Sequence, residues 1–168
     1  RGRIADLPYR LVREARIGGV DEIPVLDDLL GSWPRARFNI DVKESAAIGP
    51  LAETIRRTNS YDRICLTSFS DERLARARAA VGRQVCSSLG PRGVAALRAA
   101  ATTSGYGRLL TRLARAGVPC AQVPAGFRHL RITTPALIRT AHALGMQIHV
   151  WTVNDTREMG RLLDFGVD

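Results

Sequence analysis

The chain has 168 residues, 45% of them hydrophobic and 24% charged, which is the composition of a soluble globular protein. Its length is enough for one domain with a real core and too short to expect two. No stretch approaches the roughly 20 apolar residues that a membrane-spanning helix requires. The net charge of +9 is compatible with an anionic partner, but the arginines are scattered and aromatic residues make up only 5%, so we expect no nucleic-acid partner.

Residues 1–36 differ in pattern from the rest of the chain. Asp6–Arg16 is predicted to form a short helix that ends at Gly18 and Gly19. A second helix is expected to begin within Ile23–Leu30 and to lead into the first strand.

From residue 37 onward, short apolar runs alternate with amphipathic segments of helical period. The runs are short and partly β-branched, as expected for parallel strands covered on one face. The predicted strands are Arg37–Lys43, Arg63–Phe69, Gln84–Leu89, Pro119–Val123 and Gln147–Val153.

The helices between these strands have clear start and stop signals. Ser70 is placed to cap a helix over Asp71–Val81, and Gly82 follows it. Two further helices have similar start and stop signals. One begins at Thr134 and Pro135 and ends at Gly145. The other begins with a capping-box pattern at Asp155 and Glu158 and ends at Gly166. Two shorter helices are expected between the third and fourth strands, split near residues 103–107.

Five βα units fit either an open doubly wound sheet or part of a (β/α)8 barrel. An open sheet that binds nucleotides needs a glycine-rich phosphate loop after its first strand, and the sequence has none. Polar residues instead cluster at successive strand ends: Asp41, Lys43, Thr67, Ser68, Ser87, Ser88, Gln122, Thr152 and Asn154. We therefore predict an α/β fold, a single domain that is a partial TIM barrel with about five parallel strands.

Lys43 is the only lysine in the chain, whereas the other 24 basic residues are all arginine (25 − 1 = 24). It follows Asp41 by two residues, so alternation along a strand puts both side chains on one face. A carboxylate and a compact ammonium group at a strand end suit a metal ion and a phosphate. An ordinary ion pair at the strand end is the alternative.

The remaining candidates are weaker. Cys65, Cys86 and Cys120 have no metal-ligand spacing and are interpreted as buried, reduced core thiols, which favours a reducing compartment. His129, His142 and His149 have no carboxylate neighbour at ligand spacing, so we assign them structural roles. Asn154 could lie beside a pocket or cap a helix, and we prefer the role of a helix cap for it.

Several segments resemble the glycerophosphodiester phosphodiesterase family, in order and over nearly the whole chain. They are the IPxL-like Ile23–Leu26, the NIEIK-like Asn39–Lys43, the dipeptide Ser68-Phe69, the VWTVN sequence Val150–Asn154 and the LLxxGVD sequence Leu162–Asp168. The resemblance implies a (β/α)8 barrel whose active site lies at the carboxyl ends of the strands. It also implies hydrolysis of glycerophosphodiesters to glycerol 3-phosphate and an alcohol, with Mg²⁺ or Ca²⁺ as cofactor.

The same resemblance assigns roles to individual residues. Asp41 takes the place of a glutamate metal ligand, and Lys43 matches the catalytic lysine near the phosphate. Trp151 matches an aromatic residue of the substrate pocket. Ser68, at its strand end, is a candidate for substrate binding, although its sequence context favours the role of a hydrogen-bonding residue of the strand.

The family's His-Arg-Gly, acid-x-acid and His-Asp motifs do not occur in this sequence. We therefore expect the chain to be a fragment that holds strands three to seven and is inactive alone, with the acid–base histidines outside it. Two alternatives remain open: a non-catalytic barrel that binds a phosphorylated ligand, and a related phospholipase-type phosphodiesterase. A cytoplasmic location is expected, and the oligomeric state is undetermined.

Overall fold

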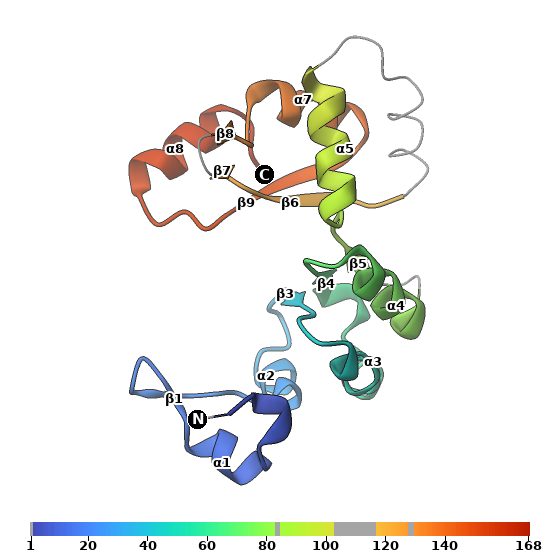
Figure 1. Cartoon of the computed structure of the whole chain (residues 1–168), viewed down its shortest axis with the longest axis vertical. Coiled ribbons are helices and arrows are strands. Elements are labelled where there is room, and N and C mark those ends of the chain that lie inside the picture. Colours follow the sequence, from blue (N-terminus) through green and yellow to red (C-terminus); the bar gives the residue numbers. More distant parts are fainter. Residues whose placement is uncertain (1, 83–84, 103–116, 128–129) are drawn as a thin grey trace. The chain divides into compact units, whose positions relative to one another are not determined.

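The computed structural model describes residues 2–82, 85–102, 117–127 and 130–168 (Figure 1). It consists of two compact units, residues 1–36 and residues 37–168. In the described ranges, no helix combines the length and the apolar character needed to cross a membrane.

The first unit contains short elements only. They are a 3-10 helix at Ile4–Asp6, α1 (Tyr9–Glu14), an antiparallel pair formed by β1 (Arg16–Ile17) and β2 (Asp21–Glu22), and α2 (Leu26–Ser32). The prediction of a helix over Asp6–Arg16 was too long at both ends. Pro8 is the residue before α1, and Gly18 and Gly19 (φ +61° and +79°) turn the chain into the hairpin instead of ending a helix.

The second unit is built on parallel strands, and the five predicted strands are present. They are β3 (Phe38–Asp41), β4 (Ile64–Thr67), β5 (Cys86–Ser87), β6 (Cys120–Pro124) and β9 (Gln147–Trp151). β3, β4 and β5 pair in that order, and β6 pairs with β9. A parallel bridge between Ser88 and Cys120 joins the two groups, and the amide of Leu89 donates to the carbonyl of Cys120 over 2.9 Å.

Helices follow the strands, as predicted for βα units. They are α3 (Ile48–Arg57), α4 (Asp71–Val81), α5 (Pro91–Thr102), α7 (Pro135–Ala143) and α8 (Thr156–Asp164), with 3-10 turns at Ser45–Ala47 and Tyr61–Arg63. A small hairpin of β7 (Gly126–Phe127) and β8 (Leu130–Arg131) follows β6. The predicted division into two helices near residues 103–107 lies outside the described residues.

Two helix starts confirm the local sequence signals. The Ser70 hydroxyl accepts a hydrogen bond from the Arg73 amide over 3.3 Å, and α4 has the predicted bounds. The Thr134 hydroxyl accepts from the Leu137 amide over 3.2 Å, with Pro135 in the first turn of α7. Each cap satisfies an amide that would otherwise lack a partner at the helix start.

The hydrophobic core lies between one face of the sheet and the helices. Ala121, Val123 and Ile148 on β6 and β9 are completely buried against helix residues such as Leu97 and Leu137. Because side chains alternate along a strand, residues one position away point to the opposite face. That opposite face carries polar and thiol side chains: Asn39, Asp41, Cys65, Thr67, Cys86, Ser88, Cys120, Gln122 and His149. We call it the concave face.

Side-chain contacts across several strands show that this face is curved. The Gln122 amide on β6 donates to the Asn39 side-chain oxygen on β3 over 3.0 Å. The two strands are three places apart, and a flat sheet with a strand spacing of about 4.8 Å would separate them by about 14 Å. The sheet therefore curls toward the concave face, as the wall of a barrel does.

The start of α8 corrects one assignment. Its cap is Asp155, whose carboxylate accepts from the Glu158 amide over 2.8 Å, which confirms the capping-box pattern at Asp155 and Glu158. The prediction of Asn154 as the cap is wrong. An Asp cap also places a negative charge at the positive end of the helix dipole.

This difference between neighbours gives a direct test. In the full-length protein, Asp155→Ala should lower the free energy of unfolding by about 1 kcal/mol, because it leaves the Glu158 amide without its cap. Asn154→Ala, one residue away, should leave it nearly unchanged. Chemical denaturation measures the free energy of unfolding of both variants. An equal loss in both would contradict the assignment of Asp155 as the cap.

Candidate active site

Asp41 and Lys43 lie where the sequence predicted them, at the carboxyl end of β3. Their side chains form an ion pair, with the Lys43 side chain 72% exposed and that of Asp41 26% exposed. A pair this exposed contributes little to stability. Its place at the end of a parallel strand, where barrel enzymes collect their reactive groups, is therefore the more informative property.

One oxygen of Asp41 has no partner. The ammonium group of Lys43 binds Oδ2, whereas Oδ1 is buried and has no hydrogen bond to any described residue. A buried carboxylate oxygen without a partner is unfavourable, and a hard cation is a partner that would remove the penalty. The donor type and its state thus fit a Mg²⁺ or Ca²⁺ ligand.

Two aromatic rings flank this pair. The Lys43 ammonium lies 5.2 Å from the centre of the Phe69 ring, within the range of a cation–π contact. Phe69 in turn meets Trp151 edge-to-face, with ring centres 5.6 Å apart and planes at 81°. Both rings remain exposed, at 67% and 40%. The carboxylate, the ammonium group and the two rings therefore form one cluster, and Phe69 is a member that the sequence assigned no role.

Ser68 does not join this cluster. It is only 4% exposed, and its hydroxyl donates to the Val42 carbonyl over 2.7 Å and accepts from the Ser70 amide over 3.3 Å. The alternation along β4 turns it away from Thr67 and Phe69. The geometry favours the interpretation of Ser68 as a hydrogen-bonding residue that fixes the strand end.

The same alternation divides the predicted ring of polar residues. Thr67, Ser88 and Gln122 lie on the concave face, and the Ser88 hydroxyl donates to that of Thr67 over 2.9 Å. Ser87 is 2% exposed and points, like Ser68, toward the helices. The polar residues predicted to cluster at the strand ends therefore lie on two faces of the sheet and do not form one group.

Arg73 is a positioning residue that the sequence did not reveal. Its guanidinium donates to the carbonyls of Lys43 and Val42. It joins the first turn of α4 to the segment that carries the lysine. No local pattern distinguishes it from Arg76, which is exposed on the same helix.

The described histidines stand apart from the Asp41 and Lys43 pair. His142 on α7 contacts Asp168, with 2.9 Å between Nε2 and Oδ2, a carboxylate neighbour that is 26 residues away in sequence and was not expected. Burial would raise the pKa of Asp168, but hydrogen bonds from the Ile148 amide and His142 lower that pKa below its ordinary value. His149 lies on the concave face beside Gln122, and His129 is outside the described residues.

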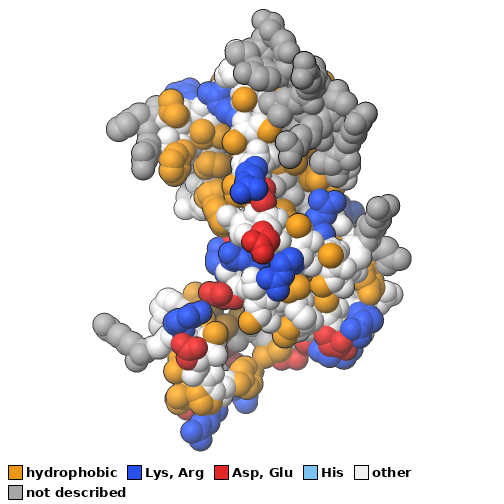
Figure 2. Space-filling model, turned by 45° about the vertical axis from the view of Figure 1, so that its right-hand side comes forward, with side chains coloured by type: hydrophobic (Ala, Val, Ile, Leu, Met, Phe, Trp, Pro, Cys, Tyr) orange, Lys and Arg blue, Asp and Glu red, His pale blue; other side chains and the backbone are white. Residues whose placement is uncertain are grey.

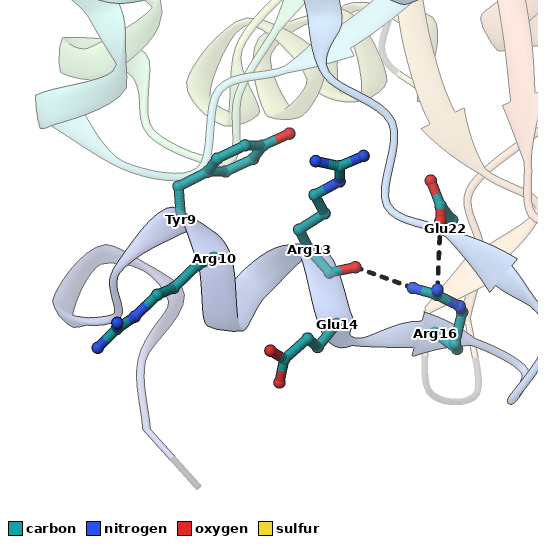
Figure 3. Close-up of a pocket in the computed structure, with 6 residues that line it drawn as sticks. All are labelled: Tyr9, Arg10, Arg13, Glu14, Arg16 and Glu22. Carbon is teal, nitrogen blue, oxygen red and sulfur yellow. Dashed lines mark hydrogen bonds and ion pairs between the residues drawn. The ribbon is translucent and has the colours of Figure 1, made fainter.

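A pocket of about 400 Å³ lies within the first unit and contains none of the predicted site residues. Figure 3 shows its wall: Tyr9, Arg10, Arg13, Glu14, Arg16 and Glu22. Arg16 is already bound to Glu22 over 3.2 Å and to the Arg13 carbonyl over 2.8 Å. Because the charge of Arg16 is already paired within the wall, the pocket does not look like a site for a charged ligand. On the face drawn in Figure 2, basic side chains likewise alternate with acidic ones and form no single patch.

A curved sheet of parallel strands, covered by helices and with a charged cluster at the strand ends, is an α/β arrangement of the TIM-barrel type. The model of the glycerophosphoryl diester phosphodiesterase family matches residues 1–168. The chain therefore belongs to this family.

Known proteins agree with the assignment. The chain is 37% identical over 167 residues to "Probable glycerophosphodiester phosphodiesterase 2" of Mycobacterium tuberculosis (strain H37Rv), covering 99% of this chain and 62% of the relative. It thus spans less than two thirds of that relative's length.

Solved structures show the same fold. A glycerophosphodiester phosphodiesterase from Parabacteroides distasonis matches with a TM-score of 0.70 and 18% identity, covering 98% of this chain and 66% of that one. The "Putative glycerophosphoryl diester phosphodiesterase" from Silicibacter pomeroyi matches with a TM-score of 0.74 and 20% identity, covering 99% and 64%.

Arg73 offers a test of how the site is held. In the full-length protein, Arg73→Met should lower the free energy of unfolding by about 1 to 2 kcal/mol, because two backbone carbonyls lose a charged donor. Arg76→Met on the same helix is the matched control and should change it by less than about 0.5 kcal/mol. Denaturant titration measures both, and equal effects would show that the contact to the Lys43 segment has no structural role.

Proposed function

We propose that the full-length protein is a metal-dependent phosphodiesterase that hydrolyses glycerophosphodiesters to glycerol 3-phosphate and an alcohol. Family membership supports the reaction class, and the cluster at the end of β3 supports the place of the reaction. The observation that carries the proposal is the pairing of Asp41 and Lys43, with a free carboxylate oxygen, beside two exposed aromatic rings.

Asp41 would hold the cation through Oδ1, the oxygen that has no hydrogen-bond partner. Such a cation, Mg²⁺ or Ca²⁺, neutralises charge on phosphate oxygens when it is bound. The described part of the chain has no cluster of three carboxylate or histidine ligands around Asp41. In this proposal the other ligands come from residues outside the chain, as the coverage of the curated relative allows.

Lys43 would contact the phosphate. Its side chain is mostly exposed, and its ammonium group contacts both Asp41 and the Phe69 ring. A fixed positive charge stabilises the negative charge that develops on the phosphate in the transition state. The exposed faces of Phe69 and Trp151 would line the pocket for the substrate, and Ser68 would hold the end of β4 in place.

A histidine outside residues 1–168 would protonate the leaving alkoxide in this proposal. The described histidines do not replace it, because His142 is bound to Asp168 and His149 lies on β9 below Trp151. We further propose that residues 1–168 form part of a single (β/α)8 barrel and that the enzyme acts in the cytoplasm, where free thiols such as those of this chain stay reduced.

Substitution of the two charged residues tests the assignment. In the full-length enzyme, Lys43→Ala should lower kcat on glycerophosphocholine by about 10²- to 10³-fold, the loss seen when one transition-state donor is removed. Asp41→Asn should raise the Mg²⁺ or Ca²⁺ concentration needed for half-maximal rate. Release of glycerol 3-phosphate, followed with a coupled dehydrogenase, measures both effects.

The melting temperature of Lys43→Ala should stay close to that of the wild type, because its side chain is mostly exposed. Wild-type turnover in this variant would refute the role of Lys43. A wild-type protein that binds glycerol 3-phosphate but hydrolyses no diester would support the binding-only barrel instead. Preference for lysophospholipids or inositol lipids in a substrate panel would indicate the phospholipase-type alternative.

The incomplete-barrel proposal predicts the behaviour of residues 1–168 expressed alone. β3 and β9 are the edge strands of the described sheet, and unpaired parallel edges promote association. The isolated segment should therefore aggregate or melt without cooperativity, whereas the full-length protein melts sharply. Size-exclusion chromatography and calorimetry compare the two, and a cooperative monomeric melt of residues 1–168 would contradict the proposal.

A further inference from the structure

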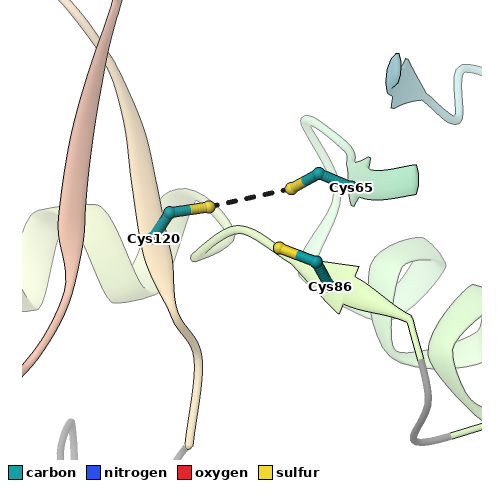
Figure 4. Close-up of side chains that lie close together, drawn as sticks. All are labelled: Cys65, Cys86 and Cys120. Atoms are coloured by element: carbon teal, nitrogen blue, oxygen red, sulfur yellow. Dashed lines mark hydrogen bonds between the residues drawn. The ribbon is translucent and has the colours of Figure 1, made fainter. Parts of the chain in front are cut away.

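Three cysteines that are far apart in sequence converge on the concave face. Cys65 on β4, Cys86 on β5 and Cys120 on β6 are free thiols whose sulfur atoms all lie within 4.8 Å of one another. Figure 4 shows the three side chains pointing toward a common centre, with 3.7 Å between the sulfurs of Cys65 and Cys120. The prediction of buried core thiols holds for Cys120 and is wrong for Cys65 and Cys86, which are only half-buried.

The sulfur separations fit a metal better than a covalent bond. A disulfide requires sulfurs about 2.05 Å apart. Zinc binds thiolates at about 2.3 Å, so two sulfurs of one tetrahedral site lie about 3.8 Å apart. The spacing of Cys65 and Cys120 matches that value, and the third sulfur lies within a small adjustment of it.

The surroundings of the cluster also suit bound thiolates. The Gln122 amide lies 3.8 Å from the Cys65 sulfur and can donate to it, and such outer donors stabilise ligating groups.

We propose that Cys65, Cys86 and Cys120 form a binding site for a soft divalent cation of the Zn²⁺ class, which ties β4, β5 and β6 together. On binding, three S–H bonds break, three metal–sulfur bonds form and three protons pass to solvent, with no change in oxidation state. In the described part of the chain no His, Asp or Glu atom belongs to the group, so the fourth position is left for a water molecule.

This site differs in chemistry from the proposed oxygen site. Asn39 pairs in register with Cys65, and Asp41 lies one repeat further toward the carboxyl end of β3. Thiolates select soft metals, whereas carboxylates select Mg²⁺ and Ca²⁺. The two sites would thus bind different kinds of cation at different positions along the strands. The sulfur site does not depend on the proposed phosphodiesterase activity.

Metal titration of the reduced, metal-free full-length protein tests the site without any substrate. Co²⁺ serves as the spectroscopic probe, because bound thiolates give an ultraviolet thiolate-to-metal charge-transfer band. Zn²⁺ affinity is then measured by competition with a chromophoric chelator. We expect the band, one Zn²⁺ per chain at this site, and no displacement of Zn²⁺ by excess Mg²⁺.

Cys86→Ser removes one of the two half-buried ligands and should weaken Zn²⁺ binding by about 10- to 100-fold or more, since loss of an outer-shell group alone has that effect. His142→Gln is the control for adventitious binding at the His142 and Asp168 pair and should leave affinity unchanged. Absence of the charge-transfer band in the wild type would overturn the proposal whether or not the variant folds. Equal Zn²⁺ affinity in Cys86→Ser and wild type would overturn it as well.

Discussion

The curvature of the parallel sheet is the constraint on which both proposed sites depend. The hydrogen bond between Asn39 and Gln122 joins strands that are three places apart, and it forms only because the sheet curls. Apolar residues on the convex side, such as Ile148 and Val123, are buried by the helices. The concave side is left to polar groups and thiols, and curvature brings these groups together from distant parts of the sequence. The aromatic pair of Phe69 and Trp151 meets for the same reason.

Much of this fold could be predicted from the sequence because the signals are local. The cap at Ser70, the proline after Thr134 and the strand alternation each depend on a few neighbouring residues. The place of Asp41 and Lys43 at the end of β3 followed from the same rules. The face of each strand-end residue was less well predicted, because a polar residue can equally satisfy a backbone carbonyl. Ser68 does so, and its burial on the helix side has no signature in its own segment.

Contacts between distant segments were not predictable from the sequence. Arg73 and Arg76 have similar sequence surroundings. Only the packing of α4 against the Lys43 segment gives Arg73 its two carbonyl partners. The pairing of His142 with Asp168 and the convergence of the three cysteines depend in the same way on strand order and register. No local pattern in one sequence records either contact. These contacts form only when the helices and strands pack against one another, so their contribution to stability depends on the tertiary structure.

The choice of lysine at position 43 follows from these surroundings. An arginine there would carry a broad, planar guanidinium that favours bidentate binding of a carboxylate, and it would compete for both oxygens of Asp41. The compact ammonium of Lys43 binds Oδ2 alone and leaves Oδ1 for another ligand. The same ammonium group lies 5.2 Å from the centre of the Phe69 ring. In a chain whose other basic residues are all arginine, this one position therefore carries the side chain that can share a carboxylate with a cation and still reach a phosphate.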